Sequence, residues 1–370
     1  DMFRGCKSLP YVDVSDWDVG KVDTMLTMFQ DCLLMETIEV GNWDVSSVTN
    51  MIQMFNRCKA LSTLDVSRWD VGKVTNTRMM FNYCTSLKEL DVSKWDTSSV
   101  QNFRSMFGSC SGLTALDVSN WETGKVTNMN CLFAKCSSLA ELDVSGWDVG
   151  NVAVFSQTFA FCPSLTALDV SNWDTSSATA MDLMFYTDYN LEYLDVSNWD
   201  VSKVTSFDSF LSSSSSNVGN MGLKSIDVSK WNTSSADDIS YMFYGCGQLE
   251  EIDMSKWDTS SVTTTYHMFA DCKKLKFVNM TDWNTPNLTN MDGMFNDCNS
   301  LESVDLSDLD TQNVEDMSQL FEYCYSLKEI KGFEKLDFSK VWDFKEMFFS
   351  CRSLETLDLS SWNTPSAEQT

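Results

Sequence analysis

The sequence has a single histidine, His267, among its 370 residues. A serine or cysteine triad requires a histidine general base, so this scarcity argues against that class of hydrolase. The 13 cysteines include no CxxC pair, which argues against the usual zinc sites. There is no glycine-rich phosphate loop either. We therefore predict no catalytic residues, no metal ligands and no enzyme activity.

Basic residues are also scarce. The chain has 26 Lys and Arg against 53 Asp and Glu, which gives a formal net charge of −27. Such a surface repels the phosphates of nucleic acids, so we expect no nucleic-acid partner. It suits cations or basic protein patches, and the plainer interpretation is that the charge keeps a long repeat protein soluble. No run of 18 apolar residues is present, so no membrane span is predicted.

The dominant positive feature is a repeat of 26 residues, to which tryptophan and phenylalanine both keep. A fixed period of this size is typical of a solenoid, in which each repeat packs on its neighbours. The spacing predicts one solenoid domain over 1–370 with about 14 coils, counted on the phenylalanine position. The columns expected to form its interior include Trp43, Trp69, Trp95, Trp121, Phe55, Phe81 and Phe107.

One coil can be followed from Leu87 to Cys110. Its LxxLDVS segment alternates apolar and polar residues, which predicts a short strand that pairs in parallel with the next coil about 4.8 Å away. Trp95 then marks a corner. Val100, Phe103 and Phe107 follow at spacings of three and four, which predicts a short helix. The expected fold class is thus an α/β solenoid of short strands and short helical segments.

Twelve cysteines share one column, represented by Cys58, Cys84 and Cys110. Equivalent side chains should point the same way, which leaves their Cβ atoms about 4.8 Å apart and wider than in a disulfide. We interpret the column as buried thiols that act as small apolar side chains. Bridges between adjacent coils, with local distortion, are the alternative. Cys131 lies outside the column and is predicted to be the most reactive thiol.

Two aspartate columns run along the repeats. The corner column, exemplified by Asp96, is replaced by asparagine at Asn232, which indicates a turn-forming role. The strand column points away from the core and is the candidate binding face, with calcium between coils as a further possibility. Its residues are Asp65, Asp91, Asp117, Asp143, Asp169, Asp195, Asp227 and Asp253, with the serines Ser67, Ser93, Ser119 and Ser145.

The repeat is interrupted once, where Trp199 and Trp231 are 32 residues apart. The extra residues predict a polar insertion loop at about 211–222. The chain opens and closes within a repeat, so we expect a leader, caps or further repeats outside it. Three sequons are glycosylation candidates: Asn232, Asn279 and Asn287.

The joint pattern LxxLDVSxWDTSxVTNMxxMFxxCxSL resembles the 26-residue bacterial surface repeat of the BspA-like leucine-rich-repeat superfamily. The resemblance covers essentially the whole chain. It implies a leucine-rich-repeat-like solenoid with its strands on one face, and a secreted or surface-anchored protein. Relatives of this kind act in adhesion and co-aggregation, and the resemblance transfers no catalytic residues.

Taken together, these observations predict a non-catalytic, extracellular or cell-surface interaction scaffold of the adhesin type. Its partner would be a protein or glycan bound on the strand face. The alternative is a structural subunit of a surface filament or layer, in which the partner is a second copy of the chain. We expect no cofactor other than the possible calcium.

Overall fold

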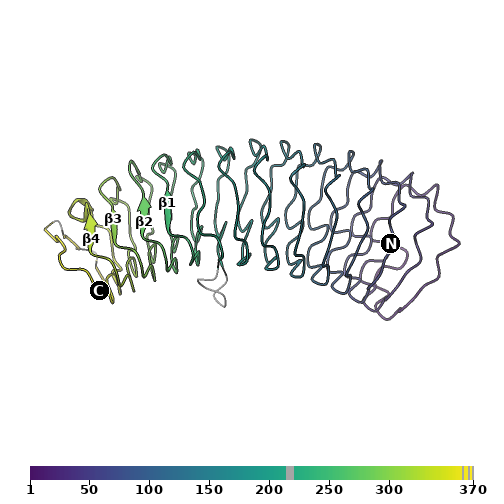
Figure 1. Cartoon of the computed structure of the whole chain (residues 1–370), viewed down its shortest axis with the longest axis horizontal. Helices are drawn as coiled ribbons and strands as arrows, with labels where there is room; N and C mark the ends of the chain where they lie inside the picture. The colour runs from purple at the N-terminus through teal and green to yellow at the C-terminus, as the bar shows by residue number, and fades with distance from the viewer. Residues whose placement is uncertain (214–220, 361, 366, 369–370) are drawn as a thin grey trace. The chain divides into compact units, whose positions relative to one another are not determined.

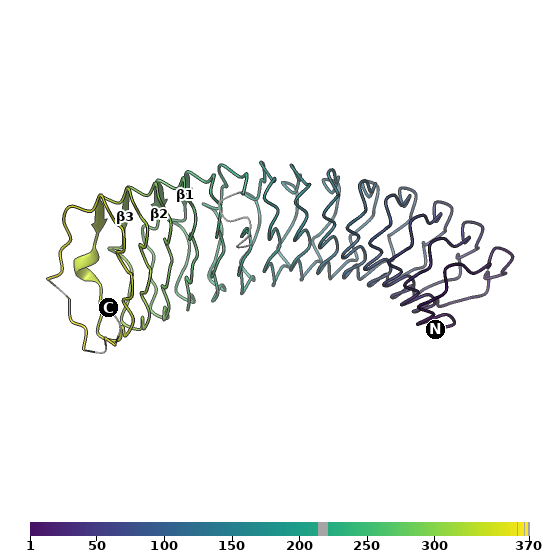
Figure 2. The same ribbon diagram turned by 90° about the horizontal axis from the view of Figure 1, so that it is seen from below.

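The computed structural model describes residues 1–213, 221–360, 362–365 and 367–368. The chain forms two compact units, Asp1–Ala178 and Thr179–Thr370. Within each unit, successive coils lie side by side in chain order, as in a solenoid (Figure 1, Figure 2). The repeat period therefore determines the fold of each unit. A single domain over 1–370 stays a prediction.

Regular strands form in the second unit, where the alternating pattern predicts them. They are β1 (Glu251–Asp253), β2 (Phe277–Asn279), β3 (Ser303–Asp305) and β4 (Glu329–Lys331), and a 3-10 helix, η1 (Phe333–Lys335), follows β4. β1 pairs with β2 and β3 with β4, both in parallel. The middle residue of each strand is buried, as in the case of Ile252 opposite Val278. In the first unit, the same segment forms isolated bridges in place of strands, as between Glu89 and Ala115.

The segment predicted as a short helix is instead a run of tight turns, and the described residues contain no α-helix. In one coil the Ser105 N–H donates to the Asn130 carbonyl of the next coil at 2.8 Å, whereas the Met106 N–H closes a turn on the Phe103 carbonyl at 2.9 Å. An α-helix bonds nearly all its N–H groups internally and could not support a neighbouring coil in this way. No helix in the described part of the chain is long and apolar enough to cross a membrane.

These turns require left-handed backbone at two positions in most coils. Ser105 has a φ of 53° and Ser109 a φ of 61°. Residues with a Cβ adopt this region at a cost, which glycine avoids. Gly293, with a φ of 60°, stands at one such position. It also lies against the His267 imidazole, which occupies the space that a Cβ would need.

Stacked aromatic rings fill the core, as the period predicts. The Trp69 and Trp95 rings are 6.4 Å apart and inclined by 6°, and those of Phe81 and Phe107 are 5.7 Å apart and inclined by 11°. Trp95 is 4% exposed and its Nε1 donates to a main-chain carbonyl of the preceding coil. The columns are therefore both apolar and hydrogen-bonded. The same burial applies to Trp43, Trp121, Phe55, Cys58, Cys84 and Cys110.

The cysteine column consists of thiols, so the disulfide alternative is wrong for it. The Cys84 Sγ donates to the Phe55 carbonyl at 3.3 Å, and the Cys110 Sγ donates to the Phe81 carbonyl at 3.1 Å. Burial raises the pKa of the Cys110 thiol to about 12. The thiols thus combine the predicted apolar packing with one directed hydrogen bond. Cys131, outside the column, is half-buried.

Residues at both ends of the predicted insertion loop, 211–222, are buried, and the loop itself stays a prediction. Leu211, Ser213 and Met221 are fully or almost fully buried, and Leu211 takes the place of a core phenylalanine. These residues belong to their coils because their side chains pack inside the stack. The rest of the predicted loop, 214–220, lies outside the described residues.

Candidate binding surface

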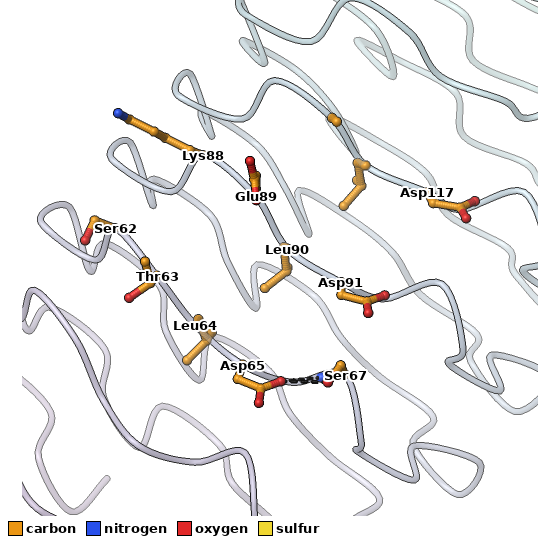
Figure 3. Close-up of a pocket in the computed structure, with 12 residues that line it drawn as sticks. Ser62, Thr63, Leu64, Asp65, Ser67, Lys88, Glu89, Leu90, Asp91 and Asp117 are labelled. Carbon is orange, nitrogen blue, oxygen red and sulfur yellow. Dashed lines mark hydrogen bonds between the residues drawn. The ribbon is translucent and has the colours of Figure 1, made fainter.

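The aspartates of the strand column project from one side of the coils, as Figure 3 shows for Asp65, Asp91 and Asp117. The Ser93 N–H donates to the Asp91 Oδ1 at 3.2 Å, and the Ser93 hydroxyl donates to the same atom at 2.7 Å. This pair recurs in other coils for Asp65, Asp117, Asp143, Asp169, Asp195 and Asp227, with Ser67, Ser119 and Ser145 among the donors. The serines therefore hold the carboxylates in place.

These bonds keep the strand aspartates ionised. The Ser93 hydroxyl, followed by the Ser93 N–H, holds the pKa of Asp91 below its usual range. The same cause lowers the pKa of Asp65, Asp143 and Asp195. Hydrogen bonds to a carboxylate favour its charged form, so the column is a line of fixed negative charges at neutral pH.

The described residues include no group of three or more histidine, cysteine or acidic side chains that could hold a metal ion. In the strand column, Asp253 accepts the Ser255 N–H at 3.0 Å. The aspartates thus already serve the main chain as turn residues. Calcium between coils stays a prediction.

Two further columns form turns of the same kind. At the corner after the tryptophan, the Asp96 Oδ1 accepts the Ser98 N–H at 3.0 Å, which confirms the turn-forming interpretation. A third column was not singled out from the sequence. There the Asn102 Oδ1 accepts the Arg104 N–H at 2.9 Å, and Asn102 itself bridges to its equivalents in both neighbouring coils. The signal for it is the asparagine in the repeated VTN segment.

The first unit has a shallow hollow on the strand face, with a volume of about 810 Å³ (Figure 3). Leu64, Leu90 and Leu116 form its apolar part. On either side of these leucines lie polar side chains, which include the aspartates Asp65, Asp91 and Asp117 and the residues Ser62, Thr63, Lys88 and Glu89. The hollow thus combines an apolar centre with an acidic border.

The described part of the second unit has three hollows on the corresponding face. Those of about 370 and 410 Å³ share Ser225, Ile226 and Asp227, and a third of about 360 Å³ shares Ser225, Glu251 and Phe277 with the larger of these. They contain the most exposed aromatic residues of the strand segments. Tyr193 is 63% exposed and Phe277 is 51% exposed. Sequence reasoning missed both. The sequence does distinguish them, because the equivalent repeat position is Thr63 or Ala115 in other coils.

A ladder of alternating charges borders the same face in the second unit. The Lys276 Nζ lies 2.9 Å from the Glu250 Oε2, and the Lys328 Nζ lies 2.9 Å from the Glu302 Oε2. This alternation of sign was not predicted, although it is visible in the sequence at the repeat spacing. Because these pairs are exposed, they contribute little to stability. They favour one register of neighbouring coils over a shifted one.

The sequon asparagines all take part in hydrogen bonds. Asn232 is exposed and its Oδ1 accepts the Ser234 N–H, whereas the Asn287 Nδ2 donates to the Ser260 carbonyl at 2.8 Å. Asn279 is half-buried at the end of β2 and lines a strand-face hollow. Glycosylation at any of them stays a prediction.

Comparison with known proteins gives one family and several solved structures. No curated protein matches the chain. A leucine-rich repeat protein from Bacteroides ovatus is 16% identical with a TM-score of 0.47, covering 99% of this chain and 85% of that one. A leucine rich cell surface protein from Faecalibacterium prausnitzii is 18% identical with a TM-score of 0.39, covering 79% of each chain. Because both TM-scores are below 0.5, the assignment of the chain to a family depends on the family model and on the stacked coils.

One family model matches repeatedly along the chain, at residues 1–115, 64–168, 109–222, 155–276, 214–329 and 302–370. These overlapping matches leave no part of the sequence uncovered. The stacked parallel coils are those of a leucine-rich-repeat-like solenoid. The chain belongs to the family described as "Mycoplasma protein of unknown function, DUF285", and its resemblance to BspA-like leucine-rich-repeat surface proteins is confirmed.

Proposed function

We propose that this protein is a non-catalytic interaction scaffold of the adhesin type, secreted or held at a cell surface, that binds a protein or glycan on its strand face. The observation that carries the proposal is the position of the hollows. In both units they lie on the strand face and combine buried aliphatic residues with ionised aspartates. Such a mixture of apolar centre and polar border is typical of protein interfaces.

Two features favour binding over catalysis. The acidic side chains repeat from coil to coil, whereas a catalytic pair needs an environment that separates its two pKa values. The single histidine, His267, packs against Tyr241 and Tyr266 away from the strand aspartates. Burial lowers the pKa of His267, which suits a neutral packing residue.

The test uses the full chain, immobilised and probed with a glycan array and a panel of purified secreted proteins. A strand-face variant, Tyr193→Thr with Phe277→Ala, removes the exposed aromatics by introducing residues that other coils have at this position. The control, Tyr83→Ser, removes an aromatic that is 42% exposed in a run of turns. We expect a ligand whose binding is lost in the strand-face variant and kept in the control. Equal loss in both, or no ligand in either collection, would contradict the proposal.

The filament alternative predicts a different behaviour in solution. Light scattering behind size exclusion, over a range of concentrations and with calcium or chelator, separates the two. We expect a constant mass in both buffers. Mass that grows with concentration would favour self-assembly, and growth only with calcium would assign the strand aspartates as its binding site.

A further inference from the structure

Two strand-face hollows of the second unit form one continuous acidic surface, because they share Ser225, Ile226 and Asp227. Five carboxylates and no basic residue line these two, whereas the third hollow, which shares Ser225, Glu251 and Phe277, adds Glu250 with Lys224 and Lys276. The five are Glu192, Asp195, Asp227, Glu251 and Asp253. We call these residues, with Tyr193 and Phe277, the Tyr193–Phe277 surface.

The aromatic residues mark the two ends of this surface. Both occupy the same strand position, with Ser225 and Glu251 at that position in the two coils between them. Three coil steps of about 4.8 Å place them roughly 14 Å apart along the stack. The hydration of an exposed aromatic ring is unfavourable in free energy, and such rings are frequent anchors of interfaces. The distance suits an extended segment of about five residues.

The charge of the surface is only partly offset by nearby lysines. Lys276 pairs with Glu250 in the neighbouring column, and with Lys224 both line the third hollow beside Phe277. Lys230 and Lys256 follow Asp227 and Asp253 in the chain and lower their pKa values slightly, but they do not line the hollows. Serine bonds are the larger cause of these lowered values. The hydrogen bonds to Asp195, Asp227 and Asp253 therefore favour their charged form.

We propose, building on the function above, that the Tyr193–Phe277 surface binds an extended arginine- or lysine-bearing segment of a partner protein. The basic side chains lie over the Tyr193 and Phe277 rings and against the carboxylates between them. Cation–π contact and paired carboxylates both favour a cationic group, and a guanidinium most of all. A neutral sugar would have to desolvate five carboxylates with no countercharge, and an acidic glycan would be repelled.

The test measures binding of a labelled peptide of alternating arginine and threonine to the full chain by fluorescence anisotropy, at about 0.15 M salt. The Tyr193→Thr, Phe277→Ala variant keeps the net charge of the chain. We expect it to weaken binding about tenfold. General attraction to an acidic protein would leave the affinity of this variant unchanged, which would overturn the proposal.

Two further double variants each remove two negative charges, one variant in each unit. Asp227→Asn with Asp253→Asn acts on the proposed surface, and Asp91→Asn with Asp117→Asn acts on the hollow of the first unit, which has no aromatic residue among its lining. Asparagine keeps the turn bond, as Asn279 does in this column. We expect the first pair to weaken binding at least fivefold more than the second, and equal effects would overturn the proposal.

A neutral oligosaccharide serves as the competing probe. Binding that depends on Tyr193 and Phe277 would show that the aromatics recognise sugar, and would also overturn the proposal. If the peptide fails to bind while the strand-face variant still abolishes binding of a ligand found with the arrays, the inference fails and the proposed function stands.

Discussion

The Trp95 Nε1 donates a hydrogen bond to the carbonyl of Val66, which lies 29 residues earlier, at 3.1 Å. Both groups are buried, and the bond joins the corner of one coil to the strand segment of the preceding one. Trp69, Trp121 and Trp147 make the equivalent bond. The tryptophan column, which the sequence identifies by its hydrophobicity, therefore also fixes the register between coils.

This bond predicts the effect of Trp95→Phe. Phenylalanine keeps much of the ring stacking and leaves the Val66 carbonyl without its donor. We expect a loss of about 1–3 kcal/mol in the free energy of unfolding, measured by urea denaturation. The control is Trp342→Phe, at a partly exposed tryptophan outside the column. A Trp95 variant as stable as the wild type would show that stacking alone holds the corner.

The left-handed backbone predicts an asymmetric response at Ser109. A β-branched residue is strained at its φ of 61°, so Ser109→Val should cost about 1–2 kcal/mol. Ser109→Gly should be neutral or slightly stabilising, since Gly245 occupies a corresponding position with a φ of 74°. The matched control is Ser62→Val in the strand segment, where β-branched residues are well tolerated. Thermal unfolding measures all three, and equal costs for the two valine variants would contradict the turn geometry.

The thiol column predicts selective alkylation. Cys110 is fully buried and its pKa is raised to about 12 by burial, so iodoacetamide should not modify it in the folded protein. Cys131 is half-buried, and we expect it to react first. Peptide mapping by mass spectrometry after a short exposure measures the order. Modification of Cys110 as fast as Cys131 would show that the column opens on that timescale.

Asp292 predicts a pH dependence of stability. Burial raises its pKa to about 6, with Asp316 and Asp343 contributing, whereas the Ser318 hydroxyl acts in the opposite direction. A carboxyl whose pKa is higher in the folded state binds its proton more tightly there. Its contribution to stability is present below about pH 4 and is lost as the pH rises through about 6.

Asp292→Asn should therefore raise the midpoint of thermal unfolding at pH 7.5 and leave it nearly unchanged at pH 4. The control is Asp282→Asn, at an exposed aspartate of the same unit. Equal shifts in the two variants, or a shift that is larger at pH 4, would contradict the assignment to Asp292.

The sequence predicts the interior of the coil better than its main chain. Equivalent residues must pack alike in a stack with a fixed period, so the burial of Trp95, Phe107 and Cys110 follows from spacing alone. The predicted helix was wrong because apolar residues three and four apart occur both in a helix and in a run of turns. Side-chain spacing shows which residues face the core, and it does not show whether an N–H bonds within its coil or to the next one.

The binding surface was predictable only in part, for a related reason. The strand aspartates and their serines are columns, and columns stand out in an aligned repeat. Tyr193 and Phe277 are departures from their column, so a search for shared residues passes over them. In a repeat protein the shared positions build the stack, whereas residues that occur in one coil are the ones that can distinguish a ligand.

The bond from each tryptophan to the coil before it has a consequence for how such a surface can change. A shift of the stacked segments by less than one coil would move an indole away from its carbonyl, whereas the six extra residues between Trp199 and Trp231 leave the match intact, because the Trp231 Nε1 still donates to the Val196 carbonyl at 3.0 Å. The separation between two surface side chains can therefore change only in steps of one coil. The coil, and not the residue number, is therefore the unit in which evolution or design can set the spacing of a binding site.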